Sequence, residues 1–508
     1  MIPNERSVVV ETKLLVTAVF HCLFGTSAYM SVGALNQLEN KVQQFVNESV
    51  SSHYAFELSQ PQIVWLWSLC VAAVPVGSII GALLTGYIME QLGRKESVTV
   101  IKDAVQISGA VLQFVSRPLN SIELFLVGRL VSGAAVGICT HIPFLLTQFS
   151  SRKEREWVST AYHMSVPFWT LVSTVLGLEN VFGLNSKWRY VLLLSGAPPI
   201  VHVILAPLFP TLPTYLYMSM RDRRASLKPL GLDSNGESDL EHDLTPNKLS
   251  QQSLLSRQRT SLYELITTKH LLWPAALCVA VNAAVNFGGK DIAIRYSSGF
   301  FELVDVREHN AQILTVLLVH VPGFLVCILG LTLQCHCGRR PLLLFGLLLG
   351  VFAVSFLTAA TLSKETNNAA AWVLAVLGLL LSSVSYHIGP SCIATVMVDE
   401  LCPTVIRSAV VKLSFLANNI PSLMVTLFFP PLQMAIGSYA VLPFVIFGTI
   451  CFILLSVFLP ESSGRSVDEI VGRWLPHHQQ QNGQSETDSL TKVKNPNGIY
   501  YYGSGFIV

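Results

Sequence analysis

Twelve long apolar runs divide this chain of 508 residues, and polar links separate them. A helix that crosses the hydrocarbon core of a bilayer needs roughly 20 mainly apolar residues. The runs lie at about 12–33, 62–88, 97–116, 121–147, 156–178, 188–209, 270–300, 310–334, 340–362, 369–399, 406–431 and 436–459. Each run predicts one membrane-spanning helix, so the expected fold is an all-α membrane protein with twelve transmembrane helices.

The overall composition excludes several classes of protein. Hydrophobic residues make up 51% of the chain and charged residues only 13%, with a mean hydropathy of +0.52. A soluble protein of this length would need more charge to cover its surface. The net charge of +2 and the lack of a basic, aromatic-rich stripe indicate no nucleic-acid partner. Neither an enzyme nor an ATP-driven pump is expected, because the sequence has no recognisable nucleophile–base pair and no GxxxxGK[ST] loop.

Two basic turns mark an internal repeat. Residues 93–95 (Gly-Arg-Lys) and 338–340 (Gly-Arg-Arg) each link two apolar runs, 245 positions apart (338 − 93). Two further pairs keep nearly the same offset: Arg155 with Arg407 (407 − 155 = 252) and Pro210 with Pro460 (460 − 210 = 250). In membranes such a repeat is typical of transporters built from two like halves around a central path. The twelve helices are therefore expected to form two six-helix bundles.

The predicted organisation has five parts. They are a cytoplasmic N-terminus (1–11), a first six-helix bundle (12–209), a cytoplasmic linker with short helices (210–269), a second bundle (270–459) and a cytoplasmic tail (460–508). The orientation follows from a modest excess of Lys and Arg in the short loops of one side. No small-residue cleavage site follows the first apolar run, so this run is expected to stay as a spanning helix. The expected location is the plasma membrane, with both termini inside.

A few residues outside the apolar runs indicate a modification or a partner. Asn47 is the one Asn-x-Ser/Thr acceptor of the chain; it falls in the first predicted outside loop and is expected to carry a glycan. The final Phe506-Ile507-Val508 would suit a peptide-binding domain that adds a strand and captures a terminal carboxylate, and a frayed tail is the alternative.

Most of the ten cysteines lie inside apolar runs, and Cys335-His336-Cys337 fits no structural zinc pattern. No metal, cofactor or disulfide framework is therefore expected.

Five segments carry the motifs of one known family. They are LWSLCVAAVPVGSIIGALLTGYIMEQLGRK (66–95), GRLVSGAAVG (128–137), CGRRPLLLFG (337–346), DELCPTVIRSA (399–409) and PESSGRSVDEI (460–470). In this order they resemble the facilitative sugar (glucose) transporters of the major facilitator superfamily, solute carrier family 2. The resemblance implies the major facilitator fold, with a central cavity between the bundles that opens alternately to each side of the membrane. It also implies a glycan at Asn47.

The resemblance further implies a latch made by charges at the cytoplasmic helix ends, which holds when the inner gate is shut. Its expected members are Arg94, Arg155, Arg339, Arg340, Glu400, Arg407 and Glu461. Basic residues at these positions also keep the loops inside, which is the alternative interpretation. The first half has lost family acids, because Gln148 stands seven positions before Arg155 and Thr211 follows Pro210. We expect an asymmetric latch that favours the inward-open state.

The expected pocket departs further from the family, whose members bind sugar hydroxyls with amide and hydroxyl side chains. The candidate substrate-binding residues are His163, Asn286, Asp291, His387, Thr395 and Asn418. His163 and His387 stand where the family has a glutamine and an acid, and Thr395 stands where it has a tryptophan. Asn286 and Asn418 retain amides. The two histidines either titrate near neutral pH or are hydrogen-bonded packing residues.

Three charged residues, Lys290, Asp291 and Arg295, interrupt the apolar run at 270–300. A charge within a spanning helix is costly and usually faces a cavity or a partner. Asp291 and Arg295 are four residues apart, so they share a helix face and can pair. The three either contact a charged solute or couple a proton, or they form an internal ion pair near the outer end of the helix.

The sequence favours one function over two alternatives. The first hypothesis is a facilitative uniporter of a hexose or related sugar. The run at 12–33 contains no Asp or Glu, which argues against proton-coupled symport. The alternatives are a carrier of another small organic solute, neutral or charged, and a transporter-shaped sensor that binds a solute without moving it. The altered pocket favours these two, whereas the motifs outside the pocket favour the first.

Overall fold

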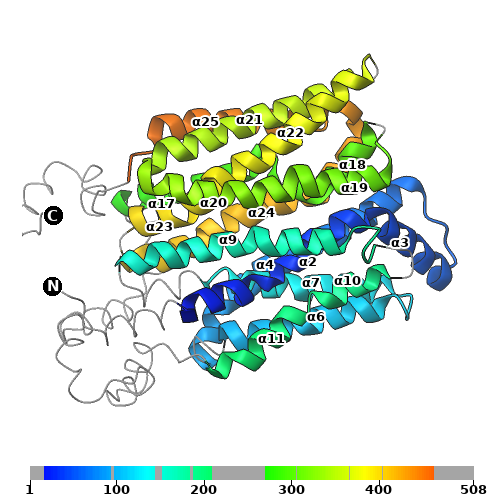
Figure 1. The fold of residues 1–508 in the computed structure, drawn as a ribbon, viewed down its shortest axis with the longest axis horizontal. Helices are drawn as coiled ribbons and strands as arrows, with labels where there is room; N and C mark the ends of the chain where they lie inside the picture. Colours follow the sequence, from blue (N-terminus) through cyan, green and yellow to red (C-terminus); the bar gives the residue numbers. More distant parts are fainter. Residues whose placement is uncertain are drawn as a thin grey trace, which may run out of the picture.

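The computed structural model describes residues 16–92, 97–142, 152–183, 187–208, 269–304, 306–364, 366–402 and 404–462. Within these ranges the regular elements are all helices, and most run along the long axis of the molecule (Figure 1). The predicted linker at 210–269 and the tail beyond Ser462 lie almost wholly outside the described residues, as do residues 1–15. The five-part division of the chain therefore stays a prediction.

The first half contains six helical segments. They are Val16–Tyr54, which includes η1 (Thr26–Tyr29), α2 (Met30–Gly33), η2 (Ala34–Leu38) and α3 (Glu39–Tyr54); α4 (Gln60–Leu92); η3 (Ser97–Ile101) with α6 (Lys102–Ser116); α7 (Ile122–Cys139); α9 (Arg152–Leu176); and α10 (Trp188–Leu194) with α11 (Ala197–Leu205) and η4 (Ala206–Leu208).

The second half contains six more. They are α17 (Lys269–Ala284) with η7 (Val285–Gly288) and α18 (Lys290–Leu303); α19 (Glu308–Thr315) with η8 (Val316–His320) and α20 (Val321–His336); α21 (Arg339–Ser363); α22 (Asn368–Ile388) with α23 (Pro390–Leu401); α24 (Thr404–Ile436) with η9 (Gly437–Tyr439); and α25 (Leu442–Phe458).

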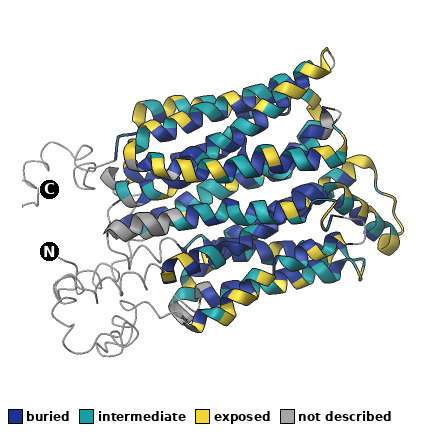
Figure 2. Cartoon of the chain, in the orientation of Figure 1, coloured by how far each residue is buried: buried dark blue, intermediate teal, exposed yellow. Residues whose placement is uncertain are grey.

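The number of helical segments agrees with the twelve runs of the sequence. In the described part of the chain, nine helical segments are long and apolar enough to cross a membrane. Three further segments, α6, α9 and α25, complete the twelve; α25 is apolar but shorter. Exposed residues lie mainly on the outward faces of the helices, and buried residues lie between them (Figure 2). Many of the exposed side chains are large and apolar, for example Leu84, Ile204 and Val457, as expected for surfaces that face lipid.

The first helix is longer than predicted. The apolar run at 12–33 continues as helix to Tyr54, where Ala55 adopts a left-handed conformation with φ of 49°. The extension brings Glu39 into this helix, so the expectation that the helix contains no carboxylate was wrong. It also places Asn47 on α3 and not in a loop; the residue is nevertheless exposed, and its glycan stays a prediction.

Two other predicted helices are broken near their middle. The helix at 270–300 breaks between α17 and α18, where Gly289 has a φ of +80°, which side chains with a Cβ rarely adopt. The helix at 369–399 breaks at Gly389, and Pro390, which has no N–H to donate, opens α23. Broken helices are tolerated at membrane depth where the freed backbone groups are buried in protein or line a cavity.

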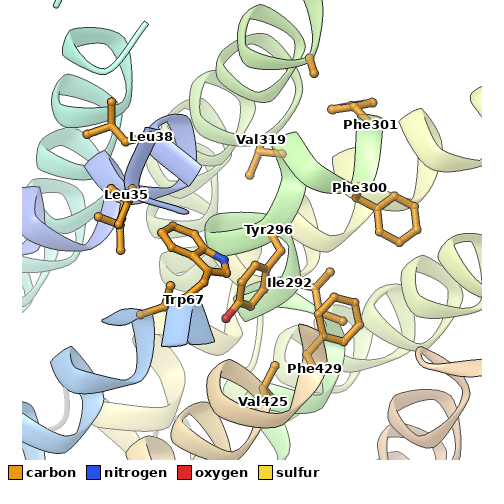
Figure 3. Packing of buried hydrophobic residues seen from close by; sticks show 14 of the residues in the cluster. Leu35, Leu38, Trp67, Ile292, Tyr296, Phe300, Phe301, Val319, Val425 and Phe429 are labelled. Atoms are coloured by element: carbon orange, nitrogen blue, oxygen red, sulfur yellow. The ribbon is translucent and has the colours of Figure 1, made fainter. Parts of the chain in front are cut away.

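The two halves meet in one apolar core near the end of the molecule that carries α3. Trp67 of α4 lies beside Tyr296 of α18 (Figure 3), and the Tyr296 ring contacts that of Phe429 of α24, with centroids 5.6 Å apart. Leu35 of the first helix belongs to the same cluster. Polar contacts across the halves close this end. Asn36 donates to Ser297 Oγ at 2.8 Å, and Gln312 Nε2 donates to the Gln37 carbonyl oxygen at 3.1 Å. We call this the Asn36 end, and the opposite end the Arg339 end.

Small residues let α4 and α7 approach closely. A Cβ added at Gly77 or Gly81 of α4 would overlap the backbone of Leu130 or Ala134 of α7. A Cβ added at Gly137 of α7 would likewise overlap the backbone of Ser78 of α4. Helices in membranes often associate through such surfaces. Lipid tails are as apolar as the helix side chains, so the hydrophobic effect does not drive two helices together, and close van der Waals contact stabilises the pair instead.

This contact makes Gly81→Ala a test of the packing. The added methyl group has to displace the Ala134 backbone, and overpacking of this kind costs about 1–3 kcal/mol. Gly86→Ala in the same helix is the matched control, since its Cβ would meet only the end of the Lys412 side chain, at 3.6 Å. In detergent we expect a lower unfolding midpoint for Gly81→Ala than for Gly86→Ala. Equal midpoints would contradict the close packing.

Candidate functional site

A cavity of about 270 Å³ lies between the two halves. Its walls come from η1, α2, α4, α7 and α9 of the first half and from α17, η7, α18, α22, α23 and α24 of the second. The polar side chains that line this central cavity are Tyr29, Ser78, Thr140, His141, Tyr162, His163, Thr170, Asn282, Lys290, Asp291, Arg295, Tyr386, His387, Ser391, Thr395, Ser414, Asn418, Asn419 and Ser422.

The structure brings five of the six predicted binding residues to this cavity. They are His163, Asp291, His387, Thr395 and Asn418. Asn286 is not among the lining residues: it is 1% exposed, and its amide donates to the Asn282 carbonyl oxygen of its own helix at 3.1 Å. Its position does not support direct contact with a solute. Contact between the other five and a solute stays a prediction.

His163 and Thr395 join the two halves across the cavity. His163 Nε2 of α9 lies 2.9 Å from Thr395 Oγ1 of α23. The Thr395 hydroxyl donates its own proton to the Cys392 carbonyl oxygen at 2.7 Å. The threonine oxygen therefore accepts from His163, whose Nε2 must carry the hydrogen. His387 Nδ1 lies 2.9 Å from the Ser383 carbonyl oxygen within α22. Both histidines are thus hydrogen-bonded wall residues.

The predicted pair between Asp291 and Arg295 is present at the start of α18. Arg295 Nε lies 3.2 Å from Asp291 Oδ1, which also accepts from Ser422 Oγ of α24 at 3.0 Å. One atom of each partner, Asp291 Oδ2 and Arg295 Nη1, is buried with no hydrogen-bond partner among the described residues. The pair is therefore internal, and each partner keeps one buried polar atom without a hydrogen bond among the described residues.

Lys290 is a second buried cation in the same place. The residue is 8% exposed and lines the cavity, with Nζ 4.7 Å from the centroid of the Tyr386 ring. Across the described residues it has no carboxylate partner. A cation–π contact returns about 0.5–2 kcal/mol, whereas burying an ion costs several kcal/mol. Of the charged side chains that line the cavity, two are cationic and one is anionic, so the formal balance is +1 (2 − 1).

Sequence reasoning missed two amides of the cavity wall. Asn282 lies one turn before Asn286 and donates to the Ala394 carbonyl oxygen of α23 at 3.0 Å. Asn419 follows Asn418 and accepts from Ser78 Oγ of α4, across the halves, at 3.3 Å. The available signal was an amide within an apolar run, one turn from the candidate Asn286 in the first case and next to the candidate Asn418 in the second.

A buried polar cluster outside the cavity was also missed. Lys102 and Asp103 of α6 form an ion pair, and each is 0% exposed. His202 Nδ1 of α11 lies 2.6 Å from Asp103 Oδ2, and His202 Nε2 lies 3.1 Å from His21 Nδ1 of the first helix. Adjacent Lys and Asp in an apolar run were the signal, because such charges need partners within the membrane. The cluster ties three helices of the first half together.

Asp103→Asn tests this cluster. The change leaves Lys102 charged and buried without its carboxylate, which we expect to cost about 3–5 kcal/mol of unfolding free energy. The matched control is Glu48→Gln, which breaks the pair with Arg117 at 2.7 Å, where both side chains are 33–40% exposed. That loss should stay below about 1 kcal/mol. Chemical unfolding in detergent compares the two, and similar losses would show that the buried cluster is not structural.

Some of the residues predicted to form the latch contact one another. Arg339 Nε lies 3.3 Å from Glu400 Oε1, and Glu400 Oε2 accepts from Ser462 Oγ at 2.6 Å. Glu461 Oε1 accepts from the backbone N–H of Arg339 at 2.9 Å. These contacts join α21, α23 and the segment after α25, all within the second half.

Of the other predicted members of the latch, Arg340 and Arg407 donate to the carbonyl oxygens of Ser456 and Cys402, respectively. Arg94, Gln148 and the Arg155 side chain lie outside the described residues, and a gating role stays a prediction.

A bundle of this shape, with a polar cavity between two like halves, is that of a membrane transport protein. The sequence matches the model of one protein family, "Sugar (and other) transporter", over residues 13–474. The chain belongs to this family.

Curated relatives cover nearly the whole chain. Facilitated glucose transporter member 5 of solute carrier family 2 from Mus musculus is 26% identical over 467 residues, which is 90% of this chain and 91% of the relative. Member 3 from Rattus norvegicus is 25% identical over 493 residues, which is 96% and 98% of the two chains.

Solved structures share the fold. The proton:xylose symporter XylE bound to 6-bromo-6-deoxy-D-glucose has a TM-score of 0.73 at 16% identity, over 92% of this chain and 100% of that one. The inward-open form of XylE from E. coli has a TM-score of 0.68 at 17% identity, over the same shares of the two chains. The protein is therefore an integral membrane protein of the major facilitator superfamily fold, as the sequence predicted.

Proposed function

We propose that the protein is a facilitative uniporter of a hexose or a related polyhydroxylated solute, which it moves by alternating access. The supporting observation is the central cavity, whose amide and hydroxyl groups come from both halves. Sugars need many directional hydrogen bonds, which such groups supply. At about 270 Å³ the cavity is slightly smaller than the pockets that bind drug-sized ligands, so a monosaccharide suits it better than a larger solute.

The state of the two ends fits this mechanism. Asn36, Gln37 and the shared apolar core close the Asn36 end. The cavity wall extends in the other direction to Thr140, His141 and Val398, the last lying two residues from Glu400 at the Arg339 end. The proposal assigns the Arg339 end to the cytoplasm, together with both termini, and Asn47 to the outside of the plasma membrane. The structure then corresponds to an inward-facing state.

The carboxylates favour uniport over proton symport. Within the described residues, Asp291 is the one carboxylate that lines the cavity, and Arg295 and Ser422 already bind it. Glu39, the nearest acid of the first helix, lies against Gly299 at the Asn36 end and not on the cavity wall. The relatives named as facilitated glucose transporters point the same way, whereas XylE is named as a symporter.

Uptake into liposomes that contain the purified protein tests the proposal. We expect saturable entry of labelled hexose, unequal competition by stereoisomers, and no accumulation above equilibrium when an inward proton gradient is imposed. Gradient-driven accumulation would replace uniport with symport. Hexose binding without uptake, by folded protein, would favour the sensor.

Asn418→Ala tests the amide wall of the cavity. Loss of one hydrogen bond to a solute hydroxyl costs about 0.5–1.5 kcal/mol, so we expect the KM for the transported sugar to rise roughly two- to tenfold. Asn310→Ala, at an exposed position of α19 outside the cavity, is the matched control and should leave KM unchanged. If the two variants have the same KM, Asn418 does not contact the solute.

A further inference from the structure

We infer that the solute carries one carboxylate, which binds to Lys290 and Arg295 in the central cavity. The inference rests on the proposed function and narrows its substrate class to sugar acids such as hexuronates. Nothing in the sugar-transport motifs requires these two cations, since the motifs concern the helix ends and the packing of the bundles. The chemistry of the cavity wall has to account for them.

Lys290 is the first observation. Its side chain lines the cavity, is more than nine-tenths buried, and has the Tyr386 ring as its neighbour but no carboxylate among the described residues. The residue follows the left-handed Gly289, so it occupies the first position of α18. The N-terminus of a helix favours anions, because its N–H groups and dipole are positive there. Two positive features therefore coincide at the break between α17 and α18.

Arg295 is the second observation. Its Nε binds Asp291, while its Nη1 is buried and has no partner among the described residues. A guanidinium presents several donors in one plane, which matches the two oxygens of a carboxylate. Asp291 thus holds Arg295 through Nε, while the residue lines the cavity with 10% of its side chain exposed. In this arrangement the Asp291 carboxylate positions the Arg295 guanidinium.

The charge balance selects the kind of anion. The charged residues of the described cavity wall sum to +1, because Asp291 offsets one of the two cations. One carboxylate brings the sum to zero. A phosphate monoester, with a charge of about −1.5 to −2 at neutral pH, would overshoot it. An uncompensated buried charge is unfavourable whether it is positive or negative, so a solute with one negative charge fits the cavity best.

Hydroxyl recognition remains available elsewhere on the wall. Ser391 and Ser414 are among the residues that line the cavity, and their Oγ atoms are buried without a hydrogen-bond partner among the described residues. Asn418 and Asn419 supply amides beside Ser414 on α24. A small molecule that combines one carboxylate with several hydroxyls would satisfy both the cations and these groups, which a neutral hexose would do only in part.

The first test compares D-glucuronate with D-glucose, which differ only at the terminal carbon. Binding to the protein in detergent is measured by calorimetry, and uptake is measured in proteoliposomes. We expect at least tenfold tighter binding of glucuronate than of glucose. Because uniport of an anion moves charge, an inside-positive potential should accelerate glucuronate uptake. Equal or weaker binding of glucuronate would overturn the inference.

Variants then locate the site. Lys290→Met keeps most of the side-chain volume without the charge and should lower the glucuronate-to-glucose affinity ratio at least tenfold. Lys290→Arg keeps the charge and should preserve the ratio, which separates the electrostatic role from misfolding. Lys187→Met, at an exposed position outside the cavity, is the matched control and should change nothing. An unchanged ratio in Lys290→Met would overturn the assignment.

Separate measurements of binding and of transport distinguish a failure of this inference from a failure of the proposed function. Lys290-dependent binding of glucuronate without uptake would support the carboxylate site and refute transport. Glucose uptake without glucuronate binding would support transport and refute the carboxylate site. Binding of neither sugar by folded protein would refute both.

Discussion

The lack of water in the bilayer core is the constraint on which this structure depends. A backbone N–H or C=O without a partner costs several kcal/mol there, so the chain crosses as helices, and irregular backbone is confined to protein-lined places. The same constraint governs side chains. Leu84 and Val457 face lipid, while Lys102, Asp103, Lys290, Asp291 and Arg295 face the interior of the bundle.

The breaks in two helices follow from this constraint. One helix is interrupted at Gly289, before α18, and another at Gly389 and Pro390, between α22 and α23. Lys290 and Asp291 line the cavity just after the first break, and Pro390 and Ser391 line it at the second. Backbone that leaves the helical pattern thus lies where polar side chains gather. The motifs outside the cavity, by contrast, join helix ends within one half, as Arg339 and Glu400 do.

The motifs and the cavity therefore carry different information. The glycines at the contact of α4 and α7 and the Arg339–Glu400 pair hold helices together. Lys290, His163 and Thr395 line the cavity. Of these two sets, the family match over residues 13–474 bears on the first, the packing of the bundle. It does not fix the second, since a pocket can change several residues while the bundle keeps its packing.

The sequence by itself determined the class of fold, because spanning helices depend on local hydropathy, and the repeat of Gly93-Arg94-Lys95 at 338–340 is visible along the chain. It also predicted the Asp291–Arg295 pair, since residues four apart share a helix face. It misjudged the end of the first helix, because the stretch up to Tyr54 is too polar to continue an apolar run, although Val42, Phe45 and Val46 give it a buried apolar face. It did not show that Asn286 lies off the cavity wall, and it missed the cluster of His21, Lys102, Asp103 and His202. Which face of a helix meets a cavity, and which distant residues meet each other, depends on how twelve helices pack. Only the tertiary structure decided that, and with it the positive charge of the central cavity.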